Sequence, residues 1–192
     1  METKLRYLSR SLDSLEFLKN NRITSIIKES YDRGLQDLAN EWWIYSQPKL
    51  LGYIVEELYN MVGEKWRDYD YLAALGLNGA PLAYLLGSRF MKRTFFVDDE
   101  WGVTSFFQQI KPAGIDLSGK NVLIVSPVFE SGLKACRGID SLRENAEDIK
   151  VDVLVMTLFP EYVDEELVRN KRYGDVTLYY LFSWTKKVRM LI

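Results

Sequence analysis

The 192-residue sequence contains no histidine and a single cysteine, Cys136. Without histidine the chain cannot build a Ser-His-Asp or Cys-His catalytic group, or any mechanism that uses an imidazole as acid and base. The usual zinc sites and facial-triad iron sites are excluded for the same reason. One cysteine cannot form a disulfide within the chain, and we interpret Cys136 as a small buried apolar residue that faces a sheet.

A long apolar run, a basic stripe and an acidic tail are also absent. The 25 basic and 27 acidic residues are scattered along the chain, so no basic stripe indicates a nucleic-acid partner. No apolar run is long enough to span a bilayer, and the charged start METKLR lacks the apolar segment of a signal peptide. We therefore expect a cytoplasmic protein without a membrane or nucleic-acid partner.

The apolar content of 47% is enough for one sizeable core, which predicts a single domain over residues 1–192. Residues 1–40 carry leucine and isoleucine at helical spacing and predict two helices, broken near Asn20-Asn21. Residues 41–160 form the predicted α/β core, which opens on a short strand in the aromatic cluster Trp42–Tyr45. Residues 161–192 predict a charged helix and then a strand at Val176–Trp184.

Strands and helices alternate through the predicted core, which is typical of an α/β fold with a mainly parallel sheet covered on both faces. Short apolar runs rich in β-branched residues mark the buried strands. In chain order the pattern predicts a helix at 48–63, a strand at 69–77, a helix at 82–90, a strand at 94–97, a strand at 122–125, a helix from about 132 to 145 and a strand at 151–157.

The first candidate site is the loop predicted from Ser126 to Ser131, between the central strand and the helix that opens near Gly132. Ligands of open α/β sheets bind at the carboxyl ends of the strands, and a helix N-terminus offers unpaired N–H groups to an anion. A nucleotide or phosphate is therefore the expected ligand. The candidate contacts are Ser126, Glu130, Ser131, Gly132 and Lys134.

A second loop, predicted from Gly76 to Ala80, faces the same edge of the sheet. Asn78 and Gly79 could present an amide and a close backbone N–H to an anion, with Gly76 opening the loop. Alternatively, Asn78-Gly79 simply makes a turn, and Pro81 starts the next helix. The long irregular stretch that follows Glu100 and runs to Gly119 is a candidate cover for the site.

Two stretches carry a resemblance to a known family: YDYLAALGLNGAPLA at 69–83 and DLSGKNVLIVSPVFESG at 116–132. They resemble the pyrophosphate loop and the phosphoribosyl pyrophosphate (PRPP) loop of type I phosphoribosyltransferases, most of all the orotate enzymes. The likeness covers roughly residues 40–160. It implies the fold of that family, Gly76, Asn78 and Gly79 as the pyrophosphate loop, and a homodimer. The strand at Val176–Trp184 also needs a covering surface, which a second copy or its own sheet could supply.

The residues that the resemblance places at the ligand depart from the family pattern. The acidic pair that holds the ribose hydroxyls falls on Ser126-Pro127, and the phosphate-binding hydroxyls fall on Glu130 and Ser131, with Gly132 retained. Acids occupy 98–100, where the orotate enzymes carry basic residues. These departures predict a protein that lacks standard PRPP-dependent catalysis and has a nucleotide- or phosphate-binding, regulatory or assembly role. The alternative is an active phosphoribosyltransferase with other PRPP contacts, and only then is Mg²⁺ expected; otherwise we expect no metal.

Glu130 is the sharpest departure. A carboxylate a few ångströms from a phosphate oxygen repels it by roughly 1 kcal/mol in water-like surroundings. The same carboxylate is favoured at a helix N-terminus, typically by about 0.3 to 1 kcal/mol. Glu130 could therefore occupy the anion seat itself, or it could point into solvent.

Overall fold

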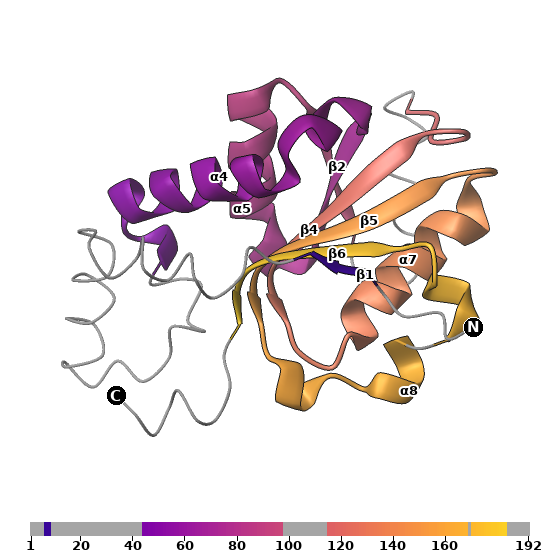
Figure 1. Ribbon diagram of the computed structural model, residues 1–192. Helices are drawn as coiled ribbons and strands as arrows, with labels where there is room; N and C mark the ends of the chain where they lie inside the picture. Colours follow the sequence, from indigo (N-terminus) through magenta and orange to yellow (C-terminus); the bar gives the residue numbers. More distant parts are fainter. Residues whose placement is uncertain (1–5, 9–43, 98–114, 169, 184–192) are drawn as a thin grey trace.

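The computed structural model describes residues 6–8, 44–97, 115–168 and 170–183 (Figure 1). Within these residues, six parallel strands form one sheet in the order β1-β6-β5-β4-β2-β3. The strands are β1 (Arg6–Leu8), β2 (Tyr71–Leu75), β3 (Arg93–Val97), β4 (Asn121–Phe129), β5 (Lys150–Leu158) and β6 (Thr177–Ser183). The helices are α4 (Pro48–Val62), α5 (Gly76–Phe90), α7 (Leu133–Asn145) and the short α8 (Glu165–Val168), with 3₁₀ turns η2 (Gly63–Asp68), η3 (Pro160–Tyr162) and η4 (Lys171–Tyr173).

Helices cover both faces of this sheet, with α4 and α5 on one side and α7 on the other (Figure 1). Successive residues of a strand point to opposite faces, and in β2 this places Leu72 and Ala74 against α4 and α5 but Ala73 against α7. All three side chains are fully buried. Burial on both faces explains why the central strands read as continuous apolar runs instead of alternating ones. The predicted α/β fold with a parallel, doubly covered sheet is confirmed.

The strand predicted at Val176–Trp184 is β6. Its position shows that its own sheet, and not a second copy, covers it. It lies between β5 and β1, paired in parallel with both. Leu178 and Tyr179 on this strand are at most 1% exposed. Because its own sheet covers it, this strand gives no argument for a second copy.

Three predictions about secondary structure are wrong. Arg6–Leu8 forms β1 beside β6, although leucine spacing favoured a helix there; pairing with an existing strand outweighs local propensity. Ile44 and Tyr45 lie in a helical turn, closed by a hydrogen bond from Gln47 N to Ile44 O at 3.0 Å, where a strand was predicted. The helix predicted from 161 to 172 is split into η3, α8 and η4. Residues 9–43, with the predicted break at Asn20-Asn21, lie outside the described residues.

The chain reverses its direction across the sheet at the boundary between β2 and β4. From β2 it passes through α5 to β3 on one side, and from β4 through α7 to β5 on the other. Helices α5 and α7 therefore open at the carboxyl ends of two neighbouring strands, on opposite faces. Such a switch point is where ligands of open α/β sheets bind. Among the described residues, no helix has the length and apolarity that crossing a membrane requires.

Candidate functional site

The end of β4 differs from the predicted loop at Ser126–Ser131. The strand continues through Ser126 and Pro127 to Phe129, and the connection to α7 is only residues 130–132. Ser126 pairs with Val155 and Phe129 with Leu158 on β5. Pro127 lacks the N–H of a normal strand residue, which is why Ser-Pro read as the end of the strand. Burial keeps the strand intact, as does the pairing with β5 of the residues just before and just after Pro127.

Ser126 is a buried residue of β4. Its side chain is buried at 8% exposure, and its hydroxyl donates a hydrogen bond to the carbonyl oxygen of Val128 at 3.1 Å. Pro127 is buried as well. The two positions on which the resemblance places the ribose-binding carboxylates are thus core positions of the sheet, without a free polar group.

The turn into α7 is built around Gly132. Its φ of +85° is a conformation that L side chains rarely adopt, and a Cβ there would lie 2.9 Å from Val168 Cγ1 and 3.0 Å from Phe129 Cζ. The Phe129 ring and Val168 therefore fill the inner side of this turn. Asp164 N donates to Ser131 O at 3.0 Å, which ties the turn to the start of α8.

The candidate anion seat at the start of α7 is partly occupied by the chain itself. Ser131 Oγ accepts a hydrogen bond from Leu133 N at 3.3 Å. Glu130 is exposed and makes no hydrogen bond or ion pair with any other described residue. Of the two alternatives for Glu130, the structure shows the solvent-facing one. Lys134, the remaining candidate in this segment, lies exposed in the first turn of α7.

Acidic residues surround this turn. Glu130 precedes it, and the hydrogen bond from Asp164 to Ser131 brings the exposed acids Asp164, Glu165 and Glu166 to its side. Like charges repel a bound anion, and the effect grows as water is excluded. These acids disfavour a phosphate at the turn, whereas Lys134 and the helix N-terminus favour one.

The second candidate loop is helical. Helix α5 begins at Gly76, so Asn78 and Gly79 lie in its first turn and Pro81 lies inside the helix. A Cβ on Gly79 would lie 2.7 Å from the carbonyl oxygen of Val125, a separation that real Cβ atoms essentially never show. Gly79 thus allows α5 to pack closely on β4, and this packing replaces the predicted turn. Asn78 is exposed, and its backbone carbonyl accepts a hydrogen bond from Tyr45 OH at 2.6 Å.

The two helix starts lie at different levels along the strands. Val125 on β4 pairs with Ala74, the second-to-last residue of β2. Strand β4 then continues for the four residues Ser126–Phe129. Because β2 also continues by one residue to Leu75, β4 extends three residues past the end of β2, which is about 10 Å of strand at about 3.3 Å per residue. Figure 1 shows the ends of β4 and β5 bending toward the side of the sheet that carries α7 and α8. The structure therefore brings Gly76, Asn78 and Gly79 to the same edge as Ser131 and Gly132, but not to the same level.

No other reactive group takes their place in the described part of the chain. Cys136 is buried on α7, as predicted, and burial raises the pKa of its thiol to about 11, so the thiol is neutral near pH 7. Among residues 6–8, 44–97, 115–168 and 170–183, no group of three acidic, cysteine or histidine residues could hold a metal ion. The acids at 98–100 and most of the candidate cover lie outside those residues.

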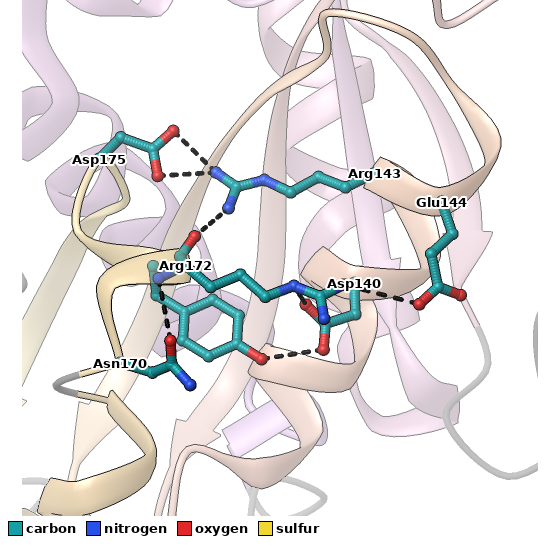
Figure 2. A network of polar contacts seen from close by, with 7 residues as sticks. Asp140, Arg143, Glu144, Asn170, Arg172 and Asp175 are labelled. Atoms are coloured by element: carbon teal, nitrogen blue, oxygen red, sulfur yellow. Dashed lines mark hydrogen bonds and ion pairs between the residues drawn. The ribbon is translucent and has the colours of Figure 1, made fainter.

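A polar network that the sequence did not predict joins α7 to η4 (Figure 2). Arg143 Nη2 lies 2.8 Å from both carboxylate oxygens of Asp175, and Nη1 donates to the carbonyl oxygen of Arg172. The Arg172 side chain in turn pairs with Asp140 at 2.8 Å and with Glu144 at 3.5 Å. Tyr173 OH donates to Asp140 at 2.8 Å, and burial followed by this bond raises the tyrosine pKa. The spacing of Asp140, Arg143 and Glu144 could have indicated a charged face on this helix. Their partners could not be predicted from the sequence.

The chain matches no protein-family model and no curated protein by sequence. Its fold is nevertheless similar to solved structures. An orotate phosphoribosyltransferase from Aeropyrum pernix has a TM-score of 0.56 and 18% identity, over 76% of this chain and 78% of that chain. An adenine phosphoribosyltransferase from Thermoanaerobacter pseudethanolicus has a TM-score of 0.56 and 15% identity, over 73% and 84%. The orotate enzyme of Mycobacterium tuberculosis, in complex with PRPP, has a TM-score of 0.53 and 14% identity, over 75% and 79%. The chain thus has the type I phosphoribosyltransferase fold.

Proposed function

From this fold and the filled turn at the end of β4, we propose that the protein is a phosphoribosyltransferase-like chain that does not catalyse PRPP-dependent transfer and acts through assembly or regulation. One observation carries the proposal. The two positions that should hold ribose are Ser126 and Pro127, and both are buried inside a paired strand. A fold hosts many functions, so these site residues weigh more than the overall likeness.

Four further features support the loss of PRPP binding. The inner side of the turn is filled by Phe129 and Val168, and the acids Glu130 and Asp164 give the surroundings the wrong charge for a phosphate. The strands that lead to the two helix starts end about 10 Å apart along the sheet, which argues against their converging on one pyrophosphate. Departure of pyrophosphate depends on cations and aligned donors that stabilise it, and the described residues of the turn supply few.

The direct test is an assay for released pyrophosphate. The full chain is incubated with PRPP, Mg²⁺ and, separately, orotate, adenine, guanine, hypoxanthine and uracil, with an active orotate phosphoribosyltransferase as positive control. We expect no release above the protein-free blank with any base. Turnover that depends on base and on Mg²⁺ contradicts the proposal and establishes the alternative, an active enzyme with other PRPP contacts and Mg²⁺ as its cofactor.

A second candidate function is the binding of a nucleotide or phosphate without catalysis. The observation that favours it is Ser131, whose exposed hydroxyl sits at the N-terminus of α7 with Lys134 nearby. Thermal unfolding with AMP, UMP, GMP and inorganic phosphate tests it, with Ser131→Ala as the control variant. A rise in midpoint that Ser131→Ala abolishes establishes this function; equal midpoints with and without ligand leave assembly or regulation.

The remaining expectations stay predictions. The cytoplasmic location expected from the sequence is one of them. A homodimer follows from the resemblance to orotate phosphoribosyltransferases. Neither rests on the site at the end of β4.

A further inference from the structure

We draw no further inference here: the strongest candidate, the exposed apolar face of α4 and α5 around Tyr53, Tyr84 and Met91, carries no proposal because nothing among the described residues shows what covers it.

Discussion

Phe159 N donates a hydrogen bond to Phe129 O at 2.9 Å, just beyond the last paired residues of β4 and β5. This bond continues the pairing of β4 with β5 at the place where a phosphate-binding loop would have to leave the sheet. Residues 126–129 are thereby held in the sheet, and Phe129 packs beneath Gly132. The loss of PRPP chemistry that we propose thus rests on the pairing of this backbone as well as on its side chains.

Because Ser126 lies buried in a paired strand, a carboxylate at this position should not create a ligand site. We expect Ser126→Asp to lower the free energy of unfolding by about 2 to 4 kcal/mol, since a buried charge loses its hydration without gaining a partner. Urea unfolding measures the change. Glu130→Thr is the control and should stay within about 0.5 kcal/mol of wild type, because Glu130 is exposed. A Ser126→Asp protein as stable as wild type and able to bind PRPP would show that the strand end opens easily.

The close packing of α5 on β4 predicts opposite effects for two glycines. Gly79→Ala should destabilise the protein by about 1 to 3 kcal/mol, because the new methyl group would lie 2.7 Å from the Val125 carbonyl oxygen. Gly52→Ala should stabilise it by about 0.5 to 1 kcal/mol, because the helix gains propensity and nothing lies near. Chemical unfolding of both variants checks the pair. A Gly79→Ala protein as stable as wild type would indicate that Gly79 lies in a loop after all.

Arg143 should contribute more to stability than its neighbours in the network. Its side chain is 19% exposed and contacts both Asp175 and the Arg172 carbonyl, whereas Glu144 is 57% exposed and reaches Arg172 at 3.5 Å. We expect Arg143→Ala to cost about 1 to 2 kcal/mol and Glu144→Ala less than about 0.5 kcal/mol. Thermal and urea unfolding measure both. Equal losses would mean that η4 is held on α7 by packing alone.

Periodicity and composition predicted most of the fold. The apolar spacing that gave a helix at 48–63 and the β-branched runs that gave strands at 122–125 and 151–157 are confirmed as α4, β4 and β5. In each case local pattern and tertiary packing favour the same structure. The predictions failed where packing overrides local signals. Proline and the pair Asn-Gly usually interrupt regular secondary structure. Here Pro127 lies within a strand and Asn78-Gly79 lies within a helix.

The candidate site shows the same division. The strand edge and the two segments that reach it were predictable, since parallel strands end at one edge. The offset between these two segments along the sheet was not predictable, because it depends on how far β4 pairs with β5. The role of Gly79 in close packing depends on the distance to Val125, which no spacing in the sequence encodes. Burial of Ser126 likewise follows from the sheet and not from its own neighbours.

Calorimetric titration of the full chain with PRPP in the presence of Mg²⁺ tests the central claim most directly. Ser126 and Pro127 are buried in the sheet, and acids lie around the turn at Gly132. We therefore predict no saturable heat up to about 1 mM PRPP, which means a binding free energy weaker than about −4 kcal/mol. A saturable one-to-one isotherm in the micromolar range, lost in a Gly132→Val variant that remains folded, would contradict it.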